Sequence, residues 1–515
     1  MKGDFTRNTF DPKKHFSRVL MQQGRVTLDA DHNEQTAILL HYMRTLARDL
    51  LGPYAVPVGE EEAFKLTTVS ASGVVNDIKI GNGHCYVDGI LVENEMDCTY
   101  LKQPDFTPPD DDALKLALGT NSTSDPFWLY LDVWERHITS LDDNGIRETA
   151  LGGPDTCTRA QVMWQVKTWV SKTEVSSTLI GSASADALVK LQDTKKKLEQ
   201  QLKKASAQKL DKLAKEIEAL DAQLAKYNES LTQPVDPPTT CEGIEGFLEL
   251  LNWYEDKKPK LAARVDPGHK ADDACVTSPD SKYRGAENQL YRVEIHRASK
   301  DGAPTFKWSR DNGSIATRWL GTTGHDIKVA STRGFAAGNW VELSDDTLEL
   351  QGEPGVLVKL VKVEGDVLSV DLSVTLPDVS EYPRNPKVRR WDQIQTEDVV
   401  LVEGAVLIKE KSETSPPKPI WIDLEDGVQV QFTSDAGSEY RSGDYWLIPA
   451  RVATGDIEWP IYEVSGETKQ QAMPPHGIKH HYAPLGLVGW NVDGVFLYPD
   501  CRCTFAPHCG LQENM

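Results

Sequence analysis

Hydrophobic and polar residues change their spacing several times along the chain, and each change predicts a different element. Residues 1–60 begin with a basic, extended segment, and the run DADHNEQTAILLHYMRTLARDLLGP follows with apolar residues at helical spacing. Asp31 is the expected N-cap, Glu34 stands three residues later as in a capping box, and Gly52-Pro53 is expected to end the helix. The pattern predicts an N-terminal arm and one amphipathic helix, both suited to docking.

Residues 61–183 change to short alternating runs and predict an antiparallel β module. The runs are IKIGNGHCYVDGILVEN, WLYLDVWERHIT and QVMWQVKTWV. Gly81-Asn82-Gly83 and Asp88-Gly89 are expected to form hairpin turns, because glycine tolerates the positive φ that such turns need. Between the runs, QPDFTPPDDDALKLALGTNSTSDP is expected to be a linker or exposed loop.

Residues 184–232 are rich in Ala, Lys, Leu and Glu and predict a coiled-coil insert. Two heptad tracks are out of register with each other, which favours a helical hairpin that turns near Ser206, and one long helix with an 11-residue stutter is the alternative. The apolar residues of the insert are expected either to bind another subunit or a second copy of the chain, or to pack against each other within the insert. The candidate interface residues are Leu213, Ile217, Leu220, Leu224, Tyr227 and Leu231.

The remaining chain returns to β patterns. Residues 233–330 are expected to continue the first β module, 331–378 to form a small β barrel, and 379–515 to form a C-terminal β module. The run YRVEIHRASKDGAPTFKWSRDNGS is expected to be a long hairpin. The predicted fold class is therefore mainly β, with several antiparallel sheets or small barrels, an N-terminal helix and an inserted helical hairpin.

Composition and charge narrow the classes of function. The chain has 515 residues, which is too long for one core, and its net charge of −22 opposes binding to nucleic acid or anionic membrane. The opening residues do not resemble a signal peptide, and no run is long and apolar enough to span a bilayer, so cytoplasmic assembly without membrane insertion is expected. The eight cysteines are too sparse for a disulfide scaffold, and most are expected to be reduced and buried.

Four long strings carry a family resemblance: KGDFTRNTFDPKKHFSRVLMQQGRVTLDADHNEQ, CYVDGILVEN, ALGGPDTCTRAQVMWQVK and YRGAENQLYRVEIHRASKDGAPTFKWSRDNGS. In order and across nearly the whole chain, they resemble an uncharacterised β-rich family associated with extracellular contractile injection systems, which are phage-tail-like particles. The resemblance implies an accessory structural component near the baseplate, spike or tail fibre, with other particle subunits as partners and an extracellular location after release. His32 stands where a Trp is expected, and the helical insert is an elaboration.

A histidine and cysteine cluster near the C-terminus is the best metal-ligand candidate. Nitrogen and sulfur ligands of this kind suit a structural zinc, but the spacing matches no standard zinc module, so buried thiols and loop histidines are the favoured interpretation. The cluster contains His476, His480, His481, Cys501, Cys503, His508 and Cys509. Asp29, Asp31, His32 and Glu34 form a second set, whose carboxylates are better explained by the start of a helix.

No set of residues predicts catalysis. His296, Ser309 and Asp311 are the residue types of a nucleophile triad, but no nucleophile elbow surrounds them, and Ser309 to Gly313 is better explained as a strand end and a tight turn. No phosphate-binding loop or dinucleotide motif predicts a cofactor. The tryptophans are expected to lie in cores, with a sugar-stacking platform as the alternative. They include Trp128, Trp134, Trp164, Trp169 and Trp308.

Two hypotheses follow. The first is a non-enzymatic structural component of a contractile injection particle, with particle subunits or further copies of the chain as partners. The second is a module carried by the particle that recognises surface glycans or degrades the envelope, for which glycoside hydrolysis would be the leading reaction.

Deletion of residues 186–231 tests whether the insert is an independent projection. We expect the shortened chain to keep a folded β body and to change its assembly, because a self-contained helical projection adds little to the β cores. Circular dichroism and thermal melting check the fold. Unfolding of the whole protein after the deletion would contradict this prediction.

Overall fold

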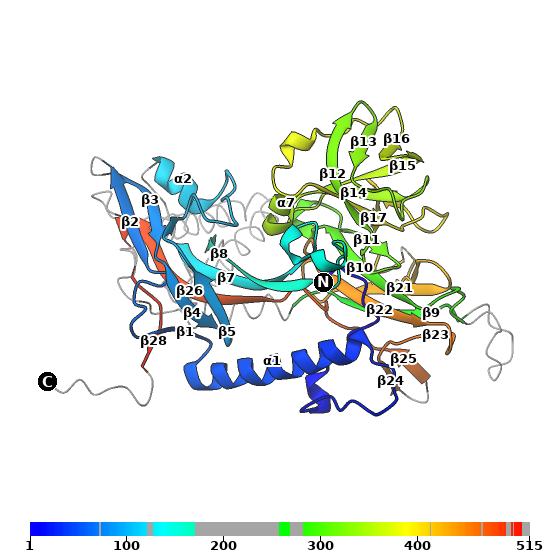
Figure 1. Cartoon of the computed structure of the whole chain (residues 1–515), viewed down its shortest axis with the longest axis horizontal. Helices are drawn as coiled ribbons and strands as arrows, with labels where there is room; N and C mark the ends of the chain where they lie inside the picture. Colours follow the sequence, from blue (N-terminus) through cyan, green and yellow to red (C-terminus); the bar gives the residue numbers. More distant parts are fainter. Residues whose placement is uncertain are drawn as a thin grey trace, which may run out of the picture.

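The structure, a computed structural model, consists mainly of antiparallel β-sheets, as the alternating pattern predicts (Figure 1). The predicted insert at 184–232, with its candidate interface residues from Leu213 to Leu231, lies outside the described residues, as does Cys509. The structure describes residues 1–71, 74–120, 127–169, 241, 257–267, 282–412, 414–464, 467–490, 496–497 and 499–506.

Helix α1 (Asp29–Leu51) confirms the predicted N-terminal helix but begins before the expected cap. Leu28 is the N-cap, and Asp31 lies inside the first turn, where its carboxylate accepts the Leu28 amide at 3.2 Å. The expectation that Asp31 is the N-cap is therefore wrong, although its carboxylate does satisfy a free amide at the helix start. The helix ends as predicted at Gly52, whose φ of +88° favours glycine. A short 3-10 helix, η1 (Pro12–Lys14), precedes it.

Three sheets form the first β module around one apolar core. Their strand orders are β28-β1-β4-β5, β2-β3-β6 and β27-β26-β7-β8. Ile78, Val92, Leu131 and Val166 are fully buried between them. The strands are β1 (Tyr54–Pro57), β2 (Leu66–Ala71), β3 (Val74–Ile80), β4 (Gly83–Val87), β5 (Ile90–Asn94), β6 (Cys98–Thr99), β7 (Phe127–Ile138), β8 (Arg159–Trp169), β26 (His480–Trp490), β27 (Phe496–Leu497) and β28 (Thr504–Phe505).

Part of the predicted loop between these runs is a helix. Helix α2 (Ala113–Thr120) buries Leu114 and Ala117 against the first module. The Asp112 carboxylate accepts the amides of Leu114 and Lys115 at 3.0 Å each, which satisfies two free donors at the start of the helix. The expectation of a loop is therefore wrong for these residues. The Pro- and Asp-rich residues on either side predict a loop, although the short run between them is apolar enough to form a buried helix. The 3-10 helices η2 (Asn144–Ile146) and η3 (Thr149–Leu151) lie between β7 and β8.

The second module combines a six-stranded sheet, a three-stranded sheet and a hairpin. The six-stranded sheet has the order β18-β19-β11-β10-β22-β23, and the three-stranded sheet has the order β20-β21-β9. Tyr291, Phe306, Phe432 and Trp446 are fully buried between the two sheets. The elements are β9 (Lys260–Val265), β10 (Gln289–Arg297), η4 (Ser299–Asp301), β11 (Thr305–Ser309), β18 (Leu401–Val402), β19 (Ala405–Leu407), β20 (Ile422–Asp423), β21 (Val428–Thr433), β22 (Tyr445–Arg451), β23 (Asp456–Ile457), β24 (Ile461–Val464) and β25 (Glu467–Gln470).

A closed barrel of order β12-β13-β16-β15-β14-β17 forms the third module. Trp319, Ile327, Val341 and Leu368 fill its interior. Helix α7 follows β14, and the Asp345 carboxylate caps it by accepting the Leu348 amide at 3.0 Å. The elements are β12 (Ala316–Thr323), β13 (Asp326–Val329), β14 (Trp340–Ser344), α7 (Asp346–Gln351), β15 (Val356–Glu364), β16 (Val367–Val370), η5 (Val379–Glu381) and β17 (Lys387–Trp391).

Strand pairing crosses the predicted module limits. The barrel extends from Ala316 to Trp391 and is therefore wider than 331–378. Strand β26, near the C-terminus, pairs with β7 of the first module. Strand β9 pairs with β21, and β10 pairs with β22, so these two strands of the segment 233–330 join C-terminal strands instead of continuing the first module. Strands β12 and β13 of the same segment belong to the barrel.

Two of the three predicted hairpins are confirmed. Asp88 and Gly89, with φ of +48° and +75°, connect β4 to β5, and β10 pairs with β11 in the expected hairpin. Gly81-Asn82-Gly83 does not form a hairpin turn, because β3 and β4 lie in different sheets.

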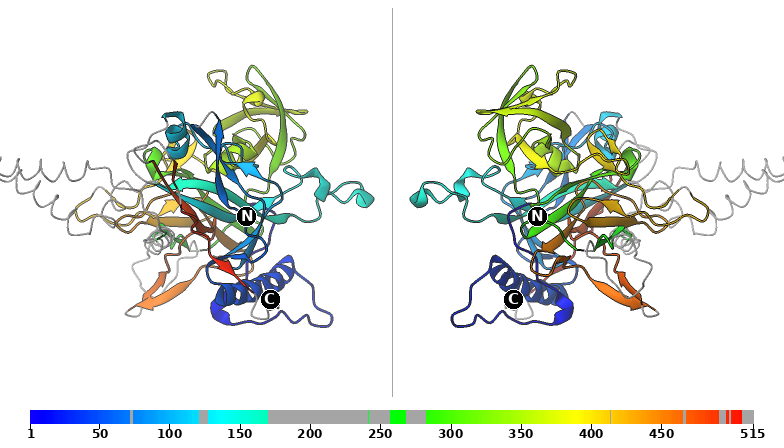
Figure 2. Two further views of the ribbon diagram at one scale, coloured as in Figure 1. Left: turned by 90° about the vertical axis from the view of Figure 1, so that its left-hand side faces the viewer. Right: turned by 90° about the vertical axis from the view of Figure 1, so that its right-hand side faces the viewer.

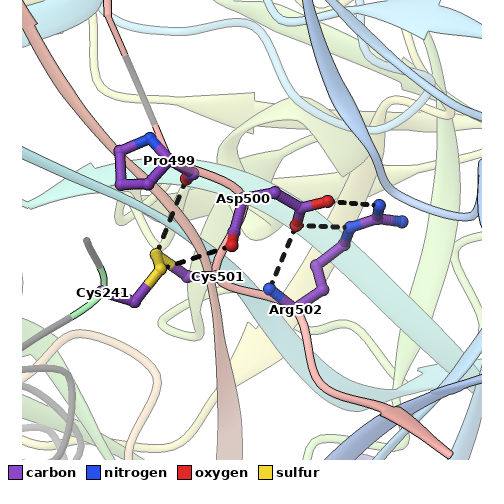
Figure 3. Close-up of a disulfide and its surroundings, with 5 residues drawn as sticks. All are labelled: Cys241, Pro499, Asp500, Cys501 and Arg502. Atoms are coloured by element: carbon purple, nitrogen blue, oxygen red, sulfur yellow. Dashed lines mark hydrogen bonds and ion pairs between the residues drawn. A yellow bond between two sulfur atoms is a disulfide. The ribbon is translucent and has the colours of Figure 1, made fainter. Parts of the chain in front are cut away.

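A disulfide joins Cys241 to Cys501 across a sequence separation of 260 residues (Figure 3). The Cys501 amide donates to the Leu485 carbonyl at 2.9 Å, so the disulfide connects residue 241 to the segment beside strand β26. Cys85 is buried, whereas Cys157 and Cys503 are exposed. The expectation that most cysteines are reduced and buried is therefore wrong for the disulfide pair and for the two exposed thiols.

Within the part of the chain that the structure describes, no helix has the length and apolar character needed to cross a membrane.

Candidate functional site

The six-stranded sheet and the barrel present charged side chains to their shared boundary. Arg292, Glu294 and His296 alternate along β10 with Val293 and Ile295, and all five are buried. The aliphatic side chains face the core of the second module, so the charged ones occupy the opposite face of the strand. This face is buried, although the same alternation is typical of a strand with one face in water.

Two cations and three carboxylates form one half of the cluster at this boundary. The Lys387 Nζ atom lies 2.7 Å from Asp142 Oδ1, 2.8 Å from Asp346 Oδ1 and 3.2 Å from Glu349 Oε2. The Arg136 guanidinium binds the same three carboxylates, at 3.4, 2.5 and 3.2 Å. The Lys387 side chain is 2% exposed. Because Arg136 belongs to β7 and Lys387 to β17, these contacts join the first module to the barrel.

The other half of the cluster contains two glutamates and three cations. Lys307 Nζ lies 2.5 Å from Glu342 Oε1 and 3.3 Å from Glu294 Oε1, and Arg292 Nε lies 2.5 Å from Glu294 Oε2. Lys2 Nζ reaches Glu294 at 3.4 Å and Glu349 of the first half at 3.7 Å. Lys2 therefore connects the two halves, at the centre of the molecule where Figure 1 marks the N-terminus. We call these ten side chains the charge cluster.

The charge cluster holds the carboxyl groups of Glu342 and Asp142 ionised. Burial by itself would raise the pKa of Glu342, but Lys307 and Lys2 outweigh burial and lower this pKa to about 2. Burial likewise opposes ionisation of Asp142, and Lys387 lowers its pKa to about 2. In the same way, burial would lower the pKa of Lys387, but Glu349, Asp142 and Asp346 raise it. Groups held in one charge state over the physiological range join modules and are poor proton donors or acceptors.

Asp142, Asp346 and Glu349 also have the geometry of a metal-ligand set, since their oxygen atoms lie within 4.8 Å of one another. The Lys387 ammonium group, however, lies within 3.2 Å of an oxygen atom of each carboxylate. This ammonium and the Arg136 guanidinium together supply positive charge to the three carboxylates. The arrangement is therefore an ion-pair cluster.

The C-terminal histidines and cysteines of the predicted zinc cluster do not converge within the described part of the chain. Cys501 forms the disulfide and has no free thiolate to offer a metal, which corrects its place among the candidates. His480 Nδ1 lies 2.6 Å from Asp132 Oδ1. His480 is five residues, or roughly 16 Å of strand, from Leu485, beside which Cys501 lies. His476 Nδ1 accepts the Leu447 amide at 3.0 Å, and Cys503 is exposed.

The three residues of the possible nucleophile triad, His296, Ser309 and Asp311, do not lie together. Ser309 Oγ donates to Asp311 Oδ1 at 2.6 Å and accepts the Gly313 amide at 3.0 Å, which confirms the tight turn. His296 instead lies 4.0 Å from Glu342. It is four residues along β10 from Arg292, the residue opposite Ser309, which is roughly 13 Å. The strand therefore keeps the histidine away from the serine.

One half-buried carboxyl has the raised pKa that a general acid requires. Burial raises the pKa of Glu425 to about 7, and burial also raises the pKa of Asp392. Arg310 contacts both carboxyls, at 2.7 Å from Glu425 and 3.8 Å from Asp392. The guanidinium therefore occupies the position where a hydrolytic pair would need substrate or water.

The described tryptophans lie in cores or are half-buried, as expected from the sequence. Trp128, Trp134 and Trp308 are buried, and Trp164 donates its indole N–H to the Glu93 carbonyl at 2.8 Å. Among the described side chains, no tryptophan belongs to the exposed large hydrophobic group. A sugar-stacking platform of tryptophans is therefore not found there.

Helix α1 contacts the body through two arginines. Arg44 makes two hydrogen bonds to the Glu135 carboxylate, at 2.8 and 3.1 Å, and Arg48 lies 3.4 Å from Asp88. The fit is close, because a Cβ atom at Gly89 would lie 2.1 Å from the Arg44 carbonyl oxygen. Ala30 and Ile38 are the buried residues of this helix.

The opposite side of α1 is apolar and exposed. Leu39, Met43, Leu46 and Leu50 are 52%, 67%, 61% and 68% exposed, and we call these four side chains the apolar stripe. Their spacing of four, three and four residues places them on one side of the helix. A helix on the surface of a self-contained domain normally shows the reverse arrangement, with its apolar side against the core.

The segment before α1 adds a second exposed apolar region. Residues 15–28, which we call the arm, expose Phe16, Leu20, Met21 and Val26, with exposures from 54% to 85%. The arm is fixed to α1 where the Val19 amide donates to Gln35 Oε1 at 2.8 Å.

The β24–β25 hairpin lies on the same side of the molecule. Figure 2 shows that the arm, α1 and this hairpin all project from the lower side in both views. Ile461, Tyr462 and Val464 of the hairpin are 62%, 48% and 42% exposed. An isolated two-stranded hairpin is marginally stable in water. Exposed apolar residues on such a hairpin are typical of a surface that a partner covers. The arm, the apolar stripe and this hairpin together form the candidate docking surface.

The fold and these contacts define a multi-module, mainly β protein with an outward apolar surface. The chain belongs to DUF6519, a family of unknown function, whose profile matches residues 1–515. No curated protein matches the sequence. Among solved structures, the chain is similar to the crystal structure of TssK at 9% identity and a TM-score of 0.17, over 81% of this chain and 99% of that one.

The charge cluster generates a stability prediction. Lys387→Met is expected to lower the free energy of unfolding by roughly 3–5 kcal/mol, because it leaves three carboxylates with one of their two shared cations removed. Lys328→Met is the matched control, since Lys328 is 62% exposed and its ion pair with Asp366 is 3.7 Å long. The control is expected to cost under roughly 1 kcal/mol. Denaturant unfolding measures both, and equal stability of the two variants would contradict the role of the cluster.

The buried histidines predict a loss of stability in weak acid. Burial lowers the pKa of His137 to about 3 and that of His296 to about 4. In the unfolded chain their pKa is roughly 6.5, so as pH falls from there to 4 the unfolded state takes up protons that the folded state refuses. The contribution of these histidines to the free energy of unfolding is therefore complete above roughly pH 6.5. Below that pH, each histidine lowers the free energy of unfolding by up to roughly 1.4 kcal/mol per pH unit.

The melting temperature between pH 7.5 and 4.5 tests this prediction. His296→Asn removes one of these buried imidazoles and is expected to flatten the slope, whereas the exposed control His15→Asn is expected to leave it unchanged. A wild-type melting temperature that stays constant or rises toward pH 4.5 would show that these histidines do not oppose protonation.

Proposed function

We propose that this protein is a non-enzymatic structural component of a contractile, phage-tail-like injection particle, positioned near its baseplate, spike or fibre. The docking surface is the part of the chain that binds neighbouring subunits. The resemblance of four long sequence strings to the family associated with such particles supports the particle assignment. Membership of DUF6519 is consistent with it but carries no function of its own.

The observation that carries the structural role is the orientation of α1. Arg44 and Arg48 hold the helix against the body, so the apolar stripe cannot turn inward without breaking these ion pairs. Apolar side chains that are 52% to 68% exposed along one stripe are costly to keep in water, and covering them stabilises an assembly. A subunit that acts through buried interface area needs no catalytic residues.

The charge cluster supports the same role by making the body rigid. It connects β7, β10, β14 and β17, which belong to all three modules, and it holds Lys2 at the start of the segment that leads to the arm. Relative movement of the modules would expose unpaired buried charges, which is costly. A rigid body keeps the docking surface in one orientation.

Glycan recognition or envelope degradation gains no support from the site. The described tryptophans that were candidates for sugar stacking are in cores or half-buried, and Arg310 separates the two carboxyls whose pKa is raised. We propose that the chain assembles in the cytoplasm, works on the particle after release, and requires no cofactor.

Adding purified chain back to particles that lack it tests this function. Mass photometry is expected to show bound wild-type protein, and Leu20→Asp, which places a charge in the arm, is expected to bind roughly tenfold or more weakly. Leu372→Asp is the matched control, because Leu372 is 80% exposed on a barrel loop outside the docking surface. The proposal is wrong if wild-type chain ignores the particles or if Leu20→Asp binds as well as the control.

A further inference from the structure

We infer that the apolar stripe of α1 pairs with the same stripe on a second copy of this chain, with the two helices antiparallel. This inference rests on the proposed function only because the stripe belongs to the docking surface. It assigns the stripe to self-association and leaves the arm for other subunits.

The spacing of the stripe favours a two-fold pair. The intervals from Leu39 to Met43, Leu46 and Leu50 are four, three and four residues, so the sequence of intervals is the same in both directions along the helix. A two-fold axis near the midpoint between Met43 and Leu46 places Leu39 opposite Leu50 of the partner subunit and Met43 opposite Leu46 of the partner subunit. Both stripes are then in register, with apolar side chains against apolar side chains.

The exposed area reaches what a stable interface needs. Two further side chains, Leu40 and Tyr42, flank the stripe and are 38% and 52% exposed. Taking on the order of 100 Å² for each of the six side chains, two copies would bury at most roughly 1,200 Å² in total, which is the lower limit for a specific interface. The dimer is therefore expected to be stable but concentration-dependent.

The charge pattern favours an identical helix over a partner of opposite charge. Arg44 and Arg48 pair with carboxylates of the body, and the flanking residues Leu40 and Tyr42 are uncharged. Asp49, seven residues after Tyr42, is the charged residue on that flank of the stripe and offers little charge with which to select another protein. Antiparallel helices also align their dipoles favourably.

The two bodies, each of net charge −22, repel each other at long range, and salt screens this repulsion. Association of identical acidic chains should therefore strengthen as salt rises. Association with a basic partner would instead weaken as salt rises, because salt screens the attraction between opposite charges.

Analytical ultracentrifugation of the full chain measures the oligomeric state across concentration and salt. The wild type is expected to form a dimer that tightens between low and moderate salt. Leu46→Glu is expected to weaken dimerisation at least roughly tenfold, while Leu372→Glu, the same change on a distant exposed leucine, leaves it unchanged. Both positions are exposed, and circular dichroism confirms the fold. Met43→Glu is the second stripe variant if Leu46→Glu misfolds.

Cysteine crosslinking tests the direction of pairing. Met43→Cys and Leu46→Cys chains are prepared separately, and their crosslinking is compared with that of the parent chain, which accounts for the exposed Cys157 and Cys503. Antiparallel pairing predicts a disulfide-linked product that is stronger in the mixture of the two variants than in either variant alone. Parallel pairing predicts products within each separate variant, which would overturn the inference.

The outcomes separate this inference from the proposed function. A wild-type chain that stays monomeric at all concentrations, or a dimer unaffected by Leu46→Glu, overturns the self-pairing of α1. If such a chain still binds particles through the arm, the proposed function stands. A dimer sensitive to Leu46→Glu that ignores the particles supports the pairing and contradicts the particle role.

Discussion

The structure depends on one constraint: charges that three β modules remove from water must be paired where the modules meet. Lys387 is almost inaccessible and contacts three carboxylates, and Lys307 bridges two glutamates from different modules. Such pairs give little net stability relative to an apolar interface, but breaking one of them is expensive. The charge cluster therefore specifies how the modules are oriented more than it adds to their stability.

This orientation determines what the N-terminal segment presents to the surroundings. Lys2 is held in the cluster, Thr6 donates its amide and hydroxyl to the Asp29 carboxylate, and Thr9 donates to Glu34. These contacts guide the chain from the centre of the molecule to the start of α1. Ion pairs from Arg44 and Arg48 then set the rotation of the helix. The exposed apolar stripe is the consequence of these polar contacts, and the proposed assembly role follows from the stripe.

Local pattern predicted the local elements well. The helix stop at Gly52-Pro53, the turn at Asp88-Gly89 and the β10–β11 hairpin all follow from nearby residues, and the structure contains them. The pairing of β26 with β7 brings together residues almost 350 positions apart, as in His480 opposite Trp134, and no local periodicity encodes it. The wider barrel and the Cys241–Cys501 disulfide depend on the same distant contacts.

The site was predicted less well, for a related reason. Alternating Arg292, Glu294 and His296 in β10 is the usual pattern of a solvent-facing strand, and only the barrel packed against it makes this face interior. The C-terminal histidines and cysteines are near in sequence, but the extended β26 strand separates His480 from the region of Cys501. In α1, the sequence predicted an amphipathic helix, but which side faces the body depends on Glu135 and Asp88.

The central claim is that the outward apolar side of α1 is an assembly interface. A cryo-electron microscopy map of the particle that contains this chain tests it most directly. The account predicts that another polypeptide, a second copy of the chain in the simplest case, covers Leu39, Met43, Leu46 and Leu50 in the assembled state. A map in which this stripe faces solvent throughout the particle, or particle preparations from which the chain is absent, would contradict the account.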